Sequence, residues 1–157
     1  MTPELSAQNN SNTRSVVLYG VAALVSLIGL ADSIYLTIQH ITGESVRCTI
    51  TSGCNEVLGS PYAVMFGMPL SELGAAAYFT VFALATLAAF QYKLAGRLMT
   101  VVVVLMFVMT LWLLYLQAFV IHHFCQFCLL SALVTTTLTV LALIAERKQK
   151  SATSPSR

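Results

Sequence analysis

Residues 98–145 read LMTVVVVLMFVMTLWLLYLQAFVIHHFCQFCLLSALVTTTLTVLALIA, and these 48 consecutive residues contain no Asp, Glu, Lys or Arg. A helix rises about 1.5 Å per residue, so roughly 20 apolar residues cross the hydrocarbon core of a bilayer. The stretch is therefore long enough for two crossings. It divides at His122-His123-Phe124-Cys125, which predicts membrane helices over about Leu98–Ile121 and Cys125–Ala145.

The composition of the whole chain points the same way. Of its 157 residues, 57% are hydrophobic and 9% are charged, whereas an ordinary soluble domain has about 25% charged residues. The length fits one compact domain without an appended soluble module. The net charge of +2 is too small to indicate a nucleic-acid partner.

Two more apolar runs precede the long stretch. The run from Val16 to Ile38 is too long for a signal-peptide core and ends in no small-x-small cleavage pattern, which predicts an uncleaved first helix. The run from Leu70 to Tyr92 contains Gly74 and other small residues that allow membrane helices to approach closely. Residues 39–69 between these runs are polar and rich in Gly and Pro, so they form a large loop. We therefore expect an all-α integral membrane protein with a bundle of four transmembrane helices.

The positive charges predict the orientation of the bundle. We expect a flexible tail over residues 1–15, a membrane domain over 16–145 and a basic tail over 146–157. The two tails and the loop after the second helix hold seven of the eight Lys and Arg residues, and the 39–69 loop holds only Arg47. Positive residues favour the cytoplasmic side, so both termini should be cytoplasmic. The 39–69 loop and the junction before the fourth helix should then lie together on the exoplasmic face.

All four cysteines fall in these two exoplasmic segments. Cys48 and Cys54 lie in the large loop, and Cys125 and Cys128 lie at the start of the fourth helix. Close cysteine pairs in an oxidising compartment are typical of disulfides, and the positive end of a helix dipole favours the thiolate that exchange requires. A loop pair can carry a disulfide between a water-soluble protein and a buried pair. The pattern predicts an electron relay.

Other interpretations of these residues stay open. The loop pair can be a static staple beside an incidental CxxC, or the four cysteines can bind zinc. His122 and His123 can act as a metal or proton-relay pair, although histidines at a helix end are more often interfacial anchors. Asp32 can accept a proton near a redox site or can simply line the bundle with a polar group. A non-enzymatic scaffold or small transporter with a structural disulfide is the alternative from a different class of protein.

The sequence resembles the bacterial branch of the vitamin K epoxide reductase family over about residues 16–145. The resemblance rests on both cysteine pairs and the motifs between them, which are Cys48-Thr-Ile-Thr-Ser-Gly-Cys54, Val57, Ser60-Pro61-Tyr62, Phe66-Gly67-Met68-Pro69, Gly74 and Phe124-Cys125-Gln126-Phe127-Cys128-Leu129. A second family of four-helix disulfide-oxidising proteins is a weaker match, because its second cysteine pair is expected on a long loop.

The resemblance implies a four-helix bundle around a quinone, either ubiquinone or menaquinone, with the large loop capping the site. It also implies a location in the bacterial cytoplasmic (inner) membrane and the reoxidation of a thioredoxin-like thiol oxidase, with two electrons passing to the membrane quinone. By position, Cys128 is expected to be the thiolate that contacts quinone and Cys125 its partner. Cys48 and Cys54 are expected to be the shuttle pair, and Ser60 provides the hydroxyl that assists at the site.

Two positions depart from the vertebrate members of the family. The places of their tyrosine and asparagine hold Ala132 and Leu70, which favours plain quinone over vitamin K epoxide as the substrate. Many bacterial relatives carry a fused thioredoxin-like domain, whereas this chain ends at Arg157 soon after the fourth helix. We therefore expect the thioredoxin-like partner to be a separate protein.

Overall fold

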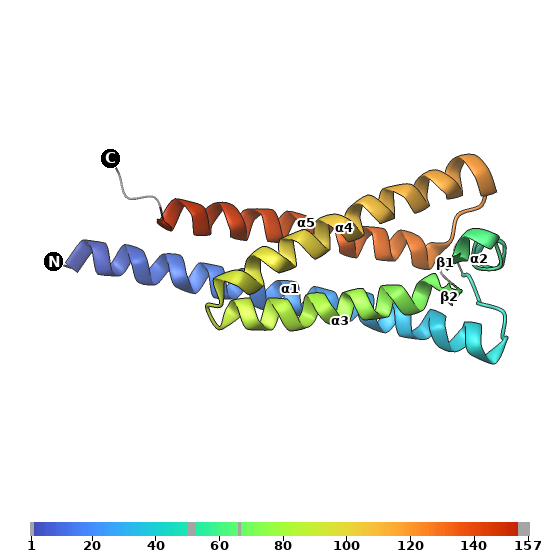
Figure 1. The fold of residues 1–157 in the computed structure, drawn as a ribbon, viewed down its shortest axis with the longest axis horizontal. Helices are drawn as coiled ribbons and strands as arrows, with labels where there is room; N and C mark the ends of the chain where they lie inside the picture. The colour runs from blue at the N-terminus through green and yellow to red at the C-terminus, as the bar shows by residue number, and fades with distance from the viewer. Residues whose placement is uncertain (1, 50–52, 66, 154–157) are drawn as a thin grey trace.

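The computed structural model describes residues 2–49, 53–65 and 67–153. Within this part of the chain, four helices are long and apolar enough to cross a membrane. They are α1 (Thr2–Thr42), α3 (Leu70–Ala89), α4 (Lys93–Leu116) and α5 (Gln126–Thr153). Figure 1 shows them running along the long axis of the molecule, with the start of α1 and the end of α5 at one end. The predicted four-helix, all-α membrane architecture is confirmed.

The first and last helices extend beyond the predicted spans. Residues 2–15, expected as a flexible tail, continue α1, because they contain no glycine and their one proline, Pro3, lies in the first turn, where its missing N–H is not needed. Thr42 ends α1 and is followed by Gly43 at φ +67°, a common helix stop. Residues 154–157 of the expected basic tail, residues 50–52 of the cysteine loop and residue 66 lie outside the described residues.

The third span changes its helical geometry at its end. After Leu116, α4 continues into a π-helical turn, η2 (Gln117–Ile121), and His122 then takes a left-handed conformation with φ 55°. Single π-helical turns are rare and frequently occur at functional sites. The chain leaves the bundle at His122 and re-enters it at α5, so the predicted division of the charge-free stretch is confirmed.

The segment between the first two spans folds into a small cap. It contains α2 (Cys54–Leu58), the 3₁₀ turn η1 (Pro61–Ala63) and the short strands β1 (Val64–Met65) and β2 (Met68–Pro69). The strands pair antiparallel, with Val64 opposite Pro69. Figure 1 places this cap over one end of the bundle, beside the start of α5. The described parts of the expected large loop therefore cover that end.

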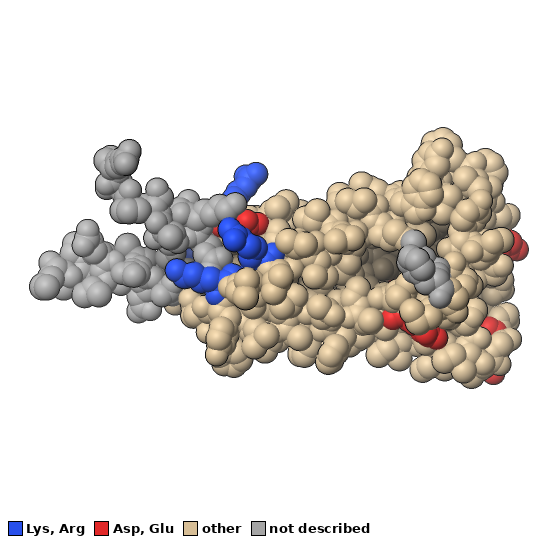
Figure 2. Space-filling view, in the orientation of Figure 1, with Lys and Arg blue, Asp and Glu red and all other residues tan. Residues whose placement is uncertain are grey.

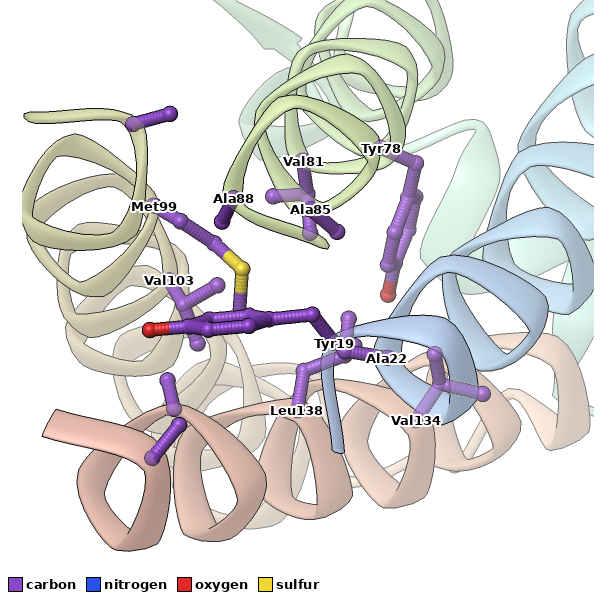
Figure 3. Close-up of a cluster of buried hydrophobic side chains, with 13 residues drawn as sticks. Tyr19, Ala22, Tyr78, Val81, Ala85, Ala88, Met99, Val103, Val134 and Leu138 are labelled. Carbon is purple, nitrogen blue, oxygen red and sulfur yellow. The ribbon is translucent and has the colours of Figure 1, made fainter. Parts of the chain in front are cut away.

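A buried apolar cluster holds the four helices together. In Figure 3 the side chains from all four helices converge on one cluster. The labelled members are Tyr19 and Ala22 of α1, Tyr78, Val81, Ala85 and Ala88 of α3, Met99 and Val103 of α4, and Val134 and Leu138 of α5. Lipid tails are as apolar as these side chains, so close packing stabilises such a bundle more than the hydrophobic effect does.

Tyr78 joins three helices near the middle of the bundle. Its hydroxyl hydrogen-bonds Ser131 Oγ at 2.7 Å and Thr135 Oγ1 at 2.9 Å on α5. Its ring lies so close to Gly29 of α1 that a Cβ at that position would overlap it. Small residues and interhelical hydrogen bonds of this kind fix helix contacts in a membrane.

Figure 2 shows Lys and Arg side chains gathered near one end of the molecule, together with an acidic side chain, and further acidic side chains toward the other end. Lys93 and Arg97 lie at the start of α4, and Arg147 lies near the end of α5, so they share the end opposite the cap. At the capped end, Glu56 lies on α2 and Glu72 in the first turn of α3. This separation gives the bundle a basic end and a more acidic, cysteine-bearing end.

Candidate redox site

A second buried cluster brings all four cysteines to one site beneath the cap. Cys54 and Cys125 are fully buried in it, although they are far apart in the sequence. The other members are Leu36 of α1, Val46, Cys48, Val57, Leu58, Ile121, Phe127 and Cys128. The two predicted cysteine pairs therefore share a single apolar environment.

The loop pair is a disulfide with one accessible and one buried cysteine. Cys48 and Cys54 are bonded, with their Cα atoms 6.1 Å apart. Cys48 is half-buried, whereas Cys54 is 1% exposed. This asymmetry gives the disulfide one side that faces outward and one side that faces the buried cluster.

Gly53 allows the Cys54 side of the loop to lie directly against the junction before α5. A Cβ at Gly53 would lie 2.7 Å from His123 Cβ and 3.0 Å from the Phe124 carbonyl oxygen. These distances are well inside van der Waals contact, so only glycine fits without a shift of the chain. The close approach holds Cys54 next to the segment that carries Cys125.

Side-chain hydrogen bonds fasten the loop on both sides of the disulfide. Beside Cys48, the Thr49 N–H donates to Gln126 Oε1 at 3.1 Å. The Val46 N–H donates to Asn55 Oδ1 at 3.0 Å. The first bond joins the cap to the start of α5, and the second closes the cap on itself.

The helix-start pair consists of two thiols. Cys125 immediately precedes α5, and its carbonyl oxygen accepts the N–H of Leu129 at 3.0 Å, so it occupies the N-cap position. The hydrogen bond from the Cys128 thiol lowers the pKa of Cys125 from 9.0 to about 7, against the effect of burial. Backbone N–H groups of Cys128 and Phe127 add to this effect. The expected stabilisation of a thiolate at the helix start therefore falls on Cys125.

Gln117 is a further residue of the site that the sequence analysis did not identify. Its side chain is 2% exposed and lies on the π-helical turn. Gln117 Oε1 accepts the backbone N–H of Cys125 at 3.1 Å, and its side chain also hydrogen-bonds Cys128. One amide thus contacts both cysteines of the pair. The available signal was an amide residue within an otherwise apolar span, eight positions before Cys125.

Asp32 lies in the bundle interior near this pair. It is 8% exposed on α1, and its carboxyl interacts electrostatically with Cys125 and Cys128. The neighbouring Ser33 is 5% exposed. The sequence analysis singled out Asp32 because of its position in a span, and the structure adds its burial one helical turn before Leu36, which packs in the cysteine cluster.

The remaining candidate residues lie at the edge of the site. The Ser60 hydroxyl donates to the Val57 carbonyl oxygen at 2.7 Å, which connects it to the cysteine cluster through Val57. His122 and His123 are exposed. In the described residues, no group of three or more His, Cys, Asp or Glu side chains is arranged to hold a metal ion.

The fold and the site define a multi-pass membrane protein with two cysteine pairs in one buried cluster. A sequence model of the Vitamin K epoxide reductase family matches residues 21–143, so the chain belongs to this family. Its sequence is also 45% identical over 56 residues to the thiol-disulfide oxidoreductase LTO1 of Arabidopsis thaliana. That match covers 35% of this chain and only 15% of LTO1.

Proposed function

We propose that the protein is a quinone-dependent thiol–disulfide oxidoreductase that reoxidises a separate thioredoxin-like thiol oxidase and so supports disulfide bond formation. Membership of the vitamin K epoxide reductase family supports redox chemistry at the cysteines. The observation that carries the proposal is the placement of the loop disulfide, because Cys48 is partly exposed while Cys54 is buried in one cluster with Cys125.

The first exchange takes place at Cys48. A thiolate of the partner attacks Cys48 Sγ, the bond to Cys54 breaks, and Cys54 leaves as the thiolate. The partner's second thiol then attacks the partner's first cysteine, which is bonded to Cys48 in the mixed disulfide, and Cys48 leaves as the thiolate. The partner has become a disulfide, and the loop pair holds two electrons and two thiols.

The second exchange passes these electrons to the helix-start pair in its disulfide form. Cys54 attacks Cys125 and Cys128 leaves as the thiolate, with the Gln117 amide hydrogen-bonding its sulfur. Cys48 then attacks Cys54 and restores the loop disulfide. The products are a loop disulfide and two helix-start thiols, which is the pairing seen in the structure.

The side chains that pack with Cys128 include apolar groups that suit a quinone ring. Cys128 is half-buried. Phe127 and Ile121 would hold the ring by apolar contact, with Cys128 beside it. When bound, a membrane quinone accepts two electrons and two protons. Ala132 and Leu70 offer no side-chain hydrogen bond where vertebrate members carry Tyr and Asn, which supports plain quinone.

The proposed orientation places the capped end on the exoplasmic face of a bacterial inner membrane and both termini in the cytoplasm. The separation of charge supports it, because Lys93, Arg97 and Arg147 lie at the end opposite the cap. After reduction, a membrane-impermeant thiol reagent should label Cys48 on intact cells. Labelling only after the cytoplasm is opened would overturn this orientation.

The decisive experiment compares two electron donors. Purified protein in lipid nanodiscs is mixed with a soluble quinone and with either a reduced thioredoxin-like protein or dithiothreitol. The double variant Cys48→Ala/Cys54→Ala should lose the reaction with the protein donor and keep it with dithiothreitol, because only a small dithiol reaches the buried pair. Cys128→Ala should lose both reactions. If the double variant were still active with the protein donor, the loop disulfide would have only a structural role.

A further inference from the structure

Asp32 is a buried carboxyl that the proposed electron transfers do not use. It lies well inside the α1 span Thr13–Thr42, with 8% of its surface exposed. In the described part of the chain, no hydrogen bond or ion pair holds its carboxyl group. An acidic side chain in a membrane span is costly and is usually retained for function. Its position therefore calls for a chemical explanation.

Helix packing does not supply that explanation. The contact between α1 and α3 at this level is made by Ser33, since a Cβ added at Gly74 would lie 3.1 Å from Ser33 Oγ. Further along α3, Tyr78 bonds to hydroxyl groups of α5. These contacts are made by hydroxyl groups and small residues, and the carboxyl of Asp32 is not part of them.

The groups around Asp32 are those that lose protons when a dithiol is oxidised. Asp32 lies one helical turn before Leu36, which packs in the cluster of Cys125 and Cys128. The charge of Asp32 acts on both thiols and on Tyr78. Tyr78 is engaged by Ser131 and Thr135. The two thiols are therefore the groups that can exchange a proton with this carboxylate during turnover.

Oxidation of the pair releases two protons, one of them at the fully buried Cys125 sulfur. When Cys125 and Cys128 become a disulfide, the S–S bond forms, both S–H bonds break, and two electrons and two protons leave the sulfurs. Cys125 is 0% exposed, so its proton cannot pass directly to bulk water. A base within the bundle has to receive it.

We propose that the Asp32 carboxylate accepts the proton that Cys125 gives up as the helix-start disulfide forms, and returns it to the two-electron acceptor. The second proton, from Cys128, goes to the same acceptor, so that two electrons and two protons leave the protein together. This inference rests on the proposed function, because it assumes an acceptor of the quinone class beside Cys128.

Two opposite effects of Asp32→Asn test this assignment. Hydrogen bonding from Cys128 lowers the pKa of Cys125, and the charge of Asp32 acts in the opposite direction. Removing that charge should therefore make Cys125 more reactive, with severalfold faster alkylation at pH 6 in the absence of quinone. The same substitution should slow dithiothreitol-driven quinone reduction by about 100-fold, as expected for the loss of a general base.

The experiment uses the Cys48→Ala/Cys54→Ala background, so that only the helix-start thiols react, and mass spectrometry follows alkylation at Cys125. Asp32→Glu, which keeps a carboxyl, should recover most of the turnover. Glu72→Gln, which removes a carboxyl at the same end of the bundle outside the cysteine cluster, should match the parent protein in both measurements. A purely structural role for Asp32 would lower the thermal unfolding temperature and would not accelerate alkylation.

The outcomes separate this inference from the proposed function. Equal turnover of the parent protein and Asp32→Asn would refute the proton role, and unchanged alkylation would refute the electrostatic link to Cys125. If the parent protein reduced no quinone with any thiol donor, the proposed function would fail instead. The alkylation rates would still show whether the charge of Asp32 affects Cys125.

Discussion

Gly53→Ala is the substitution that most directly tests contact between the loop disulfide and the helix-start pair. The backbone of Gly53 has φ −93° and ψ 9°, a conformation that residues other than glycine also adopt in type I turns. The effect of the added methyl is therefore steric. The new Cβ would lie 2.7 Å from His123 Cβ, whereas two carbon atoms prefer about 3.5–4.0 Å. The loop has to move away from the junction by about 1 Å to restore that separation.

A shift of this size separates the attacking and receiving sulfurs. A misplacement of about 1 Å can cost about 100-fold in rate, so quinone reduction driven by a thioredoxin-like protein should fall by about this factor. Dithiothreitol reaches the helix-start pair without the loop, so its reaction should be unchanged. The assay follows quinone absorbance under single-turnover conditions with each donor.

Gly20→Ala is the matched control, because nothing lies within 4 Å of a Cβ at that position. It should react like the parent protein with both donors. A Gly53→Ala protein with a protein-driven rate within twofold of the parent would refute the argument that close packing at Gly53 positions Cys54. An equal loss with both donors would show that the substitution damages the helix-start pair itself.

Three further predictions follow from the surroundings of the helix-start pair and the bundle core. With the loop cysteines replaced by alanine, the rate of Cys125 alkylation should be half-maximal near pH 7. Cys128→Ala should move this midpoint upward, because the Cys128 thiol donates a hydrogen bond to Cys125. A pH series of alkylation rates tests both statements. Gln117→Leu leaves the buried Cys125 N–H without its acceptor. The free energy of unfolding, measured by denaturant titration, should therefore drop by about 1–3 kcal/mol. An unchanged stability would contradict the hydrogen bond. Tyr78→Phe removes the hydroxyl that bonds α3 to α5 and should destabilise the bundle by about 0.6 kcal/mol, the average measured for interhelical hydrogen bonds in a membrane protein, without changing Cys125 alkylation.

The four spans were predictable because lipid imposes a strong constraint on sequence. A charged side chain is costly at the centre of a bilayer, so the charge-free residues 98–145 had to cross the membrane and turn at His122–Cys125. The meeting of the cysteine pairs was predictable for a related reason. Cys48 follows the first span and Cys125 follows the third. The chain crosses the membrane twice between them, and two crossings return it to the same face. Cys48 and Cys125 therefore had to share one face.

Contacts that depend on tertiary packing left little trace in the sequence. Gly53 was one of several glycines in a polar loop, and nothing local distinguishes it from Gly43, which ends α1 at positive φ. Gln117 was the one amide residue in a largely apolar span, and its contact with Cys125 depends on the π-helical turn that carries it. The extension of α1 to Thr2 was missed because a polar composition does not by itself prevent helix formation.

The different burial of the four sulfurs explains how one small protein could connect a water-soluble donor with a lipid-soluble acceptor. Direct exchange between these two reactants would require a folded partner to enter the bundle. The loop disulfide removes that requirement, because Cys48 is accessible while Cys54 lies against the cluster of Cys125. Electrons can then move inward by thiol exchange over short distances. The protons are harder to move, since Cys125 is fully buried, and the buried carboxyl of Asp32 is the base that we propose for that proton.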